Sequence, residues 1–166
     1  LVHGLRQRLR NPDTIKEYRK QLKALETEIL EQMKGFYDQF EGELEGHALT
    51  ADELKNGSRG IGSYFRKLNN GILSNATVEK CLEDAKHWAT KTSPRFADII
   101  DLAKSSLMQI LEDAEKLRSK NNLLLNSCRL SLQHLNKVQL LANIDEEVRQ
   151  LNHDNNRFLL SDTNAL

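Results

Sequence analysis

The sequence predicts an all-α fold, an antiparallel up-and-down helical bundle with long helices that is partly coiled-coil-like. Apolar residues recur at the period of a helix through most of the chain, and no stretch alternates β-branched and polar residues as a half-buried strand does. Aromatic residues make up only 5% of the sequence and charged residues 29%, a composition typical of soluble helical proteins. At 166 residues the chain has room for one core, so we assign residues 1–166 to a single domain.

The N-terminal part contains a short basic segment and then the first long helix. Residues 1–11 form a basic amphipathic start, because Leu1–Arg10 combines arginines with regularly spaced apolar residues. Asn11 suits an N-cap, and Pro12 suits the first position of a helix, where no backbone N–H is needed. We predict a long helix over 12–45, since its apolar residues recur about every 3.6 positions.

Residues 50–91 are predicted to form interrupted helices. Thr50 and Glu53 have the spacing of a capping box, in which each residue satisfies an amide of the other. Three glycines then fall within six residues, and we interpret 57–62 as a flexible hinge. With basic residues beside it, this stretch has a superficial likeness to a phosphate-binding loop. However, no strand precedes it and the Lys-Ser/Thr pair of a P-loop is missing.

The rest of the chain is organised around a predicted long helix over 94–142. Ser93 suits its N-cap and Pro94 its first position. One apolar row continues for the whole length with a period of about 3.5 residues, the period of a coiled-coil seam. Its members are Phe96, Ile100, Ala103, Leu107, Ile110, Ala114, Leu117, Asn121, Leu124, Cys128, Leu132, Leu135, Val138 and Ala142.

Two features of this region stay open at the level of sequence. The polar stretch 119–122 marks a possible break, although no glycine or proline supports one, and we favour a continuous helix. An asparagine on an apolar seam can fix the register of two helices, which is the role that we expect for Asn121. Beyond the long helix we predict a terminal helix over 144–160 and a frayed tail over 161–166.

No motif in the chain indicates catalysis, a cofactor or a metal, and we expect a protein that is not an enzyme. Cys81, Asp84 and His87 lie on adjacent turns, but a helical metal site needs matching ligands from a second helix. Aromatic residues beside basic ones at 64–67 are the best nucleic-acid patch available, yet they equally suit a helix with one basic and one apolar face. The formal net charge of zero also argues against nucleic-acid binding.

The predicted function is therefore protein–protein interaction, as an adaptor, scaffold, chaperone-like protein or regulatory subunit. The long helix is longer than its expected partner helix, so part of its apolar seam is left for another helix, either from a second copy or from a different protein. We expect a cytoplasmic protein with no small-molecule substrate. The predicted partner-binding residues are Leu124, Leu125, Cys128, Leu132, Leu135, Val138 and Trp88. Trp88 suits either an interface hot spot or a core residue at the end of the bundle.

Two other classes of function stay open. A secreted four-helix ligand of the cytokine kind would suit the length of the chain, the glycosylation sequons at Asn56 and Asn75, and a disulfide between Cys81 and Cys128. Buried free thiols are the alternative for these cysteines. A membrane-surface protein would instead use the basic amphipathic segment Leu1–Arg10.

Overall fold

The computed structural model describes the backbone of residues 11–164 and the side chains of residues 11–156, and this part of the chain is all-helical. The packing divides into two compact units: residues 1–24 with 128–166 form unit 1, and residues 25–127 form unit 2. The sequence analysis treats 1–166 as one domain. The buried apolar residues form two separate clusters. Along α2, no side chain of residues 23–28 is buried, and this stretch lies between the residues that α2 contributes to each cluster. The predicted basic start over 1–11 lies outside the described residues, apart from Asn11.

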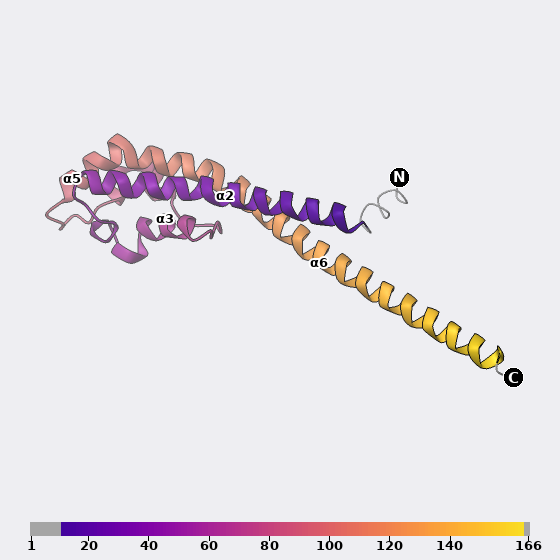
Figure 1. The fold of residues 1–166 in the computed structure, drawn as a ribbon. Coiled ribbons are helices and arrows are strands. Elements are labelled where there is room, and N and C mark those ends of the chain that lie inside the picture. The colour runs from indigo at the N-terminus through magenta and orange to yellow at the C-terminus, as the bar shows by residue number, and fades with distance from the viewer. Residues whose placement is uncertain (1–10, 165–166) are drawn as a thin grey trace. The chain divides into compact units, whose positions relative to one another are not determined.

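Two long helices and several short ones build the chain (Figure 1). The α-helices are α2 (Pro12–Gly46), α3 (Ile61–Asn69), α4 (Glu79–Glu83), α5 (Phe96–Leu102) and α6 (Met108–Asn164). Short 3₁₀ turns cover Ala51–Glu53, Gly57–Arg59 and Ala85–His87, and a π-helical segment covers Ala103–Leu107.

Helix α2 begins where the sequence places its cap. The backbone N–H of Asp13 donates to Asn11 Oδ1 at 3.0 Å, and Pro12 is the first helical residue. The capping box also forms, because the backbone N–H of Thr50 donates to Glu53 Oε2 at 2.7 Å. It starts only one 3₁₀ turn, however, since Leu54 adopts an extended conformation and ends that turn.

The long C-terminal helix differs from its prediction in three ways. It starts at Phe96 rather than at Pro94, and the π-helical segment interrupts it after Leu102. In that segment Ser105 Oγ donates to the Leu102 carbonyl at 3.1 Å, a side-chain bond that competes with the helical ladder. Beyond it, α6 runs without interruption through 119–122 and to Asn164. The terminal helix predicted over 144–160 is therefore part of α6, and the tail predicted to fray from 161 is helical as far as 164.

The buried row of α6 keeps Ala114, Asn121, Cys128 and Leu135 of the predicted seam, but the members between them are displaced by one residue. Leu111, Arg118 and Leu125 are buried, whereas their predicted counterparts, one position earlier, are partly or largely exposed. Buried positions step by four from Ala103 to Leu107 and again from Leu107 to Leu111, and steps of three and four alternate after Leu111. The displaced members follow from this extra step of four.

Unit 2 contains the larger core. Trp88, Phe40, Phe65, Met33 and Leu44 are its largest fully buried side chains. Phe40 and Phe65 stack with their ring centroids 4.1 Å apart, which joins α2 to α3. Between α2 and α6, Asn121 Nδ2 donates to Gln32 Oε1 at 2.9 Å. Predicted from the sequence to fix register, Asn121 is buried and hydrogen-bonded across these two helices.

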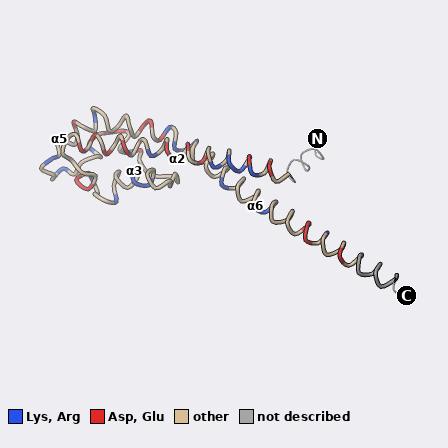
Figure 2. Tube along the Cα trace, viewed as in Figure 1, with Lys and Arg blue, Asp and Glu red and all other residues tan. Residues whose placement is uncertain are grey.

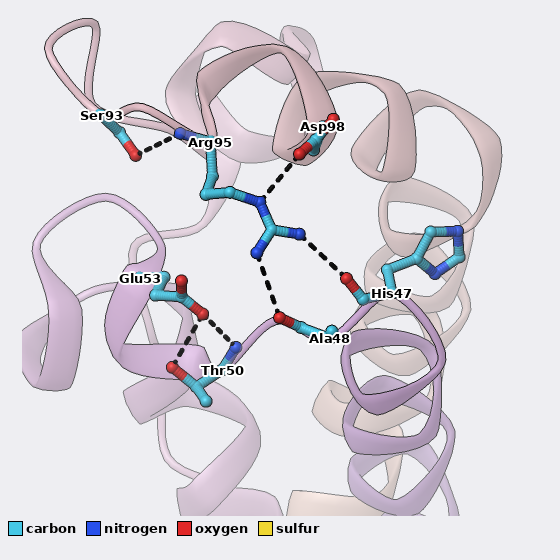
Figure 3. Close-up of polar contacts among 7 residues, drawn as sticks. All are labelled: His47, Ala48, Thr50, Glu53, Ser93, Arg95 and Asp98. Carbon is cyan, nitrogen blue, oxygen red and sulfur yellow. Dashed lines mark hydrogen bonds and ion pairs between the residues drawn. The ribbon is translucent and has the colours of Figure 1, made fainter.

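Arg95 joins the C-terminal end of α2 to the start of α5 (Figure 3). Its guanidinium donates to the carbonyl of His47 at 3.0 Å and to that of Ala48 at 3.2 Å. Its Nε donates to Asp98 Oδ2 at 2.8 Å. The Arg95 guanidinium thus donates to two backbone carbonyls just after α2, which have no backbone N–H partner within that helix.

Arg118, unlike Arg95, is buried in unit 2, and it is hydrogen-bonded to the segment that precedes α4. Arg118 pairs with Glu115 at 2.6 Å and donates to the Leu73 carbonyl at 2.9 Å. Tyr64 donates its hydroxyl hydrogen to Glu115 Oε2 at 2.9 Å, so the carboxylate accepts from both residues. Burial acts to raise the pKa of Glu115, but the hydrogen bonds from Arg118 and Tyr64 outweigh it and the pKa is lowered. Burial and the same carboxylate raise the pKa of Tyr64.

Candidate functional site

The seven predicted partner-binding residues lie in different surroundings. In unit 2, Trp88 and Leu125 are buried, while Leu124 is exposed. In unit 1, Cys128 and Leu135 are buried, and Leu132 and Val138 are partly buried. The chain itself therefore encloses four of the seven, and only part of the predicted surface is open to a partner.

Trp88 is a core residue. Its side chain is fully buried, and its indole N–H donates to the Cys81 carbonyl at 2.8 Å. Its own carbonyl accepts from the backbone N–H of Lys55, also at 2.8 Å. These bonds tie three segments of unit 2 together, so the indole presents no surface of its own for an interface.

The core of unit 1 uses the middle of the predicted seam. Ile15 and Leu22 of α2 pack with Cys128 and Leu135 of α6, and Leu132 lies against them. Beside this core, Arg19 Nη2 donates to Asn136 Oδ1 at 2.8 Å and to Gln139 Oε1 at 2.7 Å. Within unit 1, α2 therefore covers this stretch of α6, and the seam here is closed by the chain's own residues.

A different row of apolar side chains on α6 is open. We call it the C-terminal apolar face, and it consists of Leu140, Leu141, Ile144, Val148 and Leu151, which are between 47% and 65% exposed. Ile144 lies nine residues after Leu135, which at about 100° per residue places it on the opposite side of the helix from the buried row. The face is thus separate from the core of unit 1. Positions 141, 144, 148 and 151 alternate steps of three and four, which is the spacing of a helix-packing seam.

A groove lies on the same side of α6 as the C-terminal apolar face, and acidic residues flank the face. A groove of about 480 Å³ in unit 1 includes Leu130 and His134, which fall on the same side of α6, together with Tyr18 of α2. Asp145, Glu147 and Asp154 flank the face, and Figure 2 shows acidic positions on this part of α6. Asp145 is paired with Arg149 at 3.3 Å. A net negative edge therefore borders an apolar strip.

Sequence reasoning did not assign the C-terminal apolar face, although the signal was present. Ile144, Val148 and Leu151 are regularly spaced, but the sequence predicts them to lie in a separate terminal helix over 144–160. Only the position of the buried row shows that they lie on the other side of the same helix. The row in 124–138 and the row in 140–151 are two faces of α6, not one seam.

The other residues considered for chemistry have structural roles. Asp84 accepts from the backbone N–H of Lys86 at 2.9 Å and so caps a 3₁₀ turn. Burial raises the pKa of the Cys81 thiol, which makes it less nucleophilic, and no disulfide joins Cys81 and Cys128. Within the described residues, no three His, Cys, Asp or Glu side chains are grouped as a metal site.

Comparisons with protein-family models, with curated proteins and with solved structures give no match to this chain. Within residues 11–164, no helix combines the length and the apolar character that are needed to span a membrane.

Proposed function

We propose that this chain is a non-enzymatic protein–protein interaction module, an adaptor, chaperone-like protein or regulatory subunit, that acts by helix–helix association. The observation that carries the proposal is the exposure of the C-terminal apolar face. Large apolar side chains that repeat on one side of a helix typically bind in the groove of a partner. Isolated exposed apolar side chains are common, but five large apolar side chains within twelve residues on one face of a helix form a continuous strip.

The architecture that we propose is the antiparallel, partly coiled-coil-like bundle that the sequence predicts. Two contacts in unit 2 support it: Gln32 is hydrogen-bonded to Asn121, and Glu43 accepts from Ser106 Oγ at 2.9 Å. Residue numbers rise along α2 as they fall along α6, which is the order that antiparallel helices give. The 3-4 spacing of buried residues after Leu107 supports coiled-coil-like packing of these helices.

The partner that we propose is a different protein, which offers a helix with an apolar stripe and basic edges. The edges of the C-terminal apolar face carry Asp145, Glu147 and Asp154; Asp145 is paired with Arg149, which leaves Glu147 and Asp154 as its acidic groups. A second copy of this chain would set acidic edges near acidic edges, whereas lysine or arginine beside the partner's stripe would complement them. Charge complementarity therefore favours association with a different chain.

Site-specific photocrosslinking in the native cell tests this proposal. A photoreactive phenylalanine analogue is placed at Leu151, on the face, and in a matched variant at Gln150, its exposed neighbour on another side of α6. We expect a discrete adduct from position 151 and none from 150. Ile144→Asp combined with Val148→Asp should abolish that adduct without loss of helix by circular dichroism, because both side chains are exposed.

Mass spectrometry of the adduct identifies the occupant. A crosslinked peptide that is helical, with basic residues beside its apolar stripe, supports the proposal. Equal adducts from both positions, or none from either, overturn it. An adduct with a second copy of the chain, together with a dimer by light scattering, overturns the choice of a different protein as partner.

A further inference from the structure

A cavity in unit 2 gathers basic side chains from three segments of the chain. It has a volume of about 630 Å³ and lies between residues 55–67, 75–78 and 80–87. Lys55, Arg59, Lys67 and Lys80 line it, with His87 beside them, and no carboxylate is among its lining residues. The sequence shows only that residues 55–95 are basic, with eight Lys or Arg against three Asp or Glu. The fold brings half of those eight to one cavity.

None of these four cations forms an ion pair within the part of the chain that the structure describes, and two carboxylates close by in the sequence are engaged elsewhere. Asp52 faces Arg66 at 3.8 Å, and Asp84 pairs with Lys86 at 2.8 Å. Like charges around a shared hollow repel one another and raise the local concentration of anions. The cavity is therefore electrostatically complementary to an anion.

The walls of the cavity are fixed by the fold. The backbone N–H of Lys55 donates to the Trp88 carbonyl at 2.8 Å, which joins the first segment to the third. A Cβ atom added at Gly60 would lie 2.0 Å from the Lys55 carbonyl oxygen, so the loop that carries Lys55 and Arg59 is closely packed. Cations on a fixed loop lose less entropy when they bind a ligand.

Several of the other lining residues provide uncharged polar groups. Tyr64 lies at one wall, held by its bond to Glu115, and Asn75 at another, where its Oδ1 accepts from Arg118 at 3.4 Å. Ser63 and Thr77 add hydroxyl groups. Hydroxyl and ammonium donors around a hollow of this size match the oxygen atoms of a phosphorylated small molecule, because small-molecule sites measure roughly 300–1,000 Å³.

We propose that this cavity binds a small ligand that carries two or more phosphate groups. One phosphate would leave much of the charge of four cations uncompensated, whereas a polyphosphate or a multiply phosphorylated headgroup would match it. The proposal is of binding alone. The cavity lies in unit 2 and uses no residue of the C-terminal apolar face, and it stands apart from the proposed association with a partner helix.

Isothermal titration of the full chain with inorganic tripolyphosphate tests the proposal. We expect one ligand per chain and an affinity that falls as salt is added. Arg59→Gln combined with Lys80→Gln should weaken binding by about 10-fold or more, because each removes a charged hydrogen-bond donor. The matched control is Lys104→Gln combined with Lys120→Gln, which removes two exposed charges of unit 2 outside the cavity, and it should change the affinity by less than about 2-fold.

Two further measurements complete the test. If the Arg59/Lys80 variant is misfolded by circular dichroism, Lys55→Gln combined with Lys67→Gln takes its place. Sedimentation with phosphatidylcholine vesicles, with and without phosphatidylinositol bisphosphate, separates a lipid headgroup from a free ligand as the source of the phosphates. Binding of either probe that depends on the cavity cations supports the proposal. Equal losses in the cavity and control variants, or no binding of either probe, overturn it.

Discussion

The side-chain amide of Asn121 donates to Gln32 Oε1 at 2.9 Å and to Met33 Sδ at 3.1 Å, which ties α6 to α2 inside unit 2. Asn121 is buried, while Gln32 is exposed and could bond to water instead. A buried amide needs a partner more than an exposed one does, so this bond favours the one alignment of the two helices in which the partners meet.

A double-mutant cycle measures that bond. We expect Gln32→Ala to lower the free energy of unfolding by about 1 kcal/mol and to show a coupling of similar size with Asn121→Ala. Gln39→Ala is the matched control, because Gln39 is an exposed glutamine of the same helix, and it should change stability by less than about 0.5 kcal/mol. Additive effects of the two changes in urea denaturation would contradict a direct interaction.

Stability at alkaline pH should depend on Tyr64. Burial and the Glu115 carboxylate raise its pKa in the folded protein above the unfolded value of about 10. Its contribution is therefore fully present below about pH 10. It is lost as pH rises toward the folded pKa, because only the unfolded chain releases the proton in that window.

Comparison with Tyr64→Phe isolates this effect. At pH 7 the variant should be less stable by about 1 kcal/mol, since one hydrogen bond to Glu115 is missing. The difference should shrink between about pH 10 and pH 11. Tyr18, an exposed tyrosine of unit 1, provides the control variant Tyr18→Phe, whose difference from the wild type should stay near zero. A wild-type advantage that grows above pH 10 would refute the assignment.

Gly60 should not tolerate a side chain. Its φ of −84° suits any residue, but a Cβ atom would lie 2.0 Å from the Lys55 carbonyl oxygen, which is backbone and cannot rotate away. We expect Gly60→Ala to destabilise unit 2 by about 2 kcal/mol or more. Gly35 has nothing within 4 Å and lies inside α2, so Gly35→Ala should stabilise the protein by up to about 1 kcal/mol. Thermal shifts of the same sign in both variants would contradict this account.

Arg95 should not be replaceable by lysine. Its planar guanidinium reaches His47, Ala48 and Asp98 together, and a single ammonium cannot reproduce that geometry. The side chain is about one-third exposed, so we expect Arg95→Lys to cost only about 1–2 kcal/mol. Lys104→Arg, at an exposed position of the π-helical segment, is the control with the reverse exchange. Equal melting temperatures for Arg95→Lys and the wild type would refute the capping role.

The two cysteines should both be titratable thiols. Cys128 is buried and Cys81 partly buried, and no disulfide joins them. We expect two equivalents to react with a thiol reagent in denaturant and much slower reaction in the folded protein, because burial shields both thiols and raises the pKa of Cys81. Cys81→Ser and Cys128→Ser each reduce the count by one and assign the rates. A protein from its native source with no reactive thiol in denaturant would support the disulfide and the secreted class.

Much of the architecture was available from sequence because it depends on local chemistry. The helical period, the cap at Asn11 and the capping box of Thr50 and Glu53 each need only neighbours within one turn. The role of Asn121 was also predictable, since a polar residue on an apolar row has few alternatives. The π-helical segment was not predictable, because it depends on serine side chains competing for the Leu102 carbonyl inside a packed helix.

The sequence alone determined that this chain is helical and where most of its helices run, because periodicity is a property of residues near one another in the chain. Tertiary structure alone decided which face of each helix is used. Leu111, Arg118 and Leu125 are buried in place of the residues that precede them, and α2 covers one side of α6 while Ile144 and Val148 stay exposed on the other. It likewise brought Lys55, Arg59, Lys67 and Lys80 around one cavity. Such convergence depends on contacts between distant residues, and no local pattern encodes it.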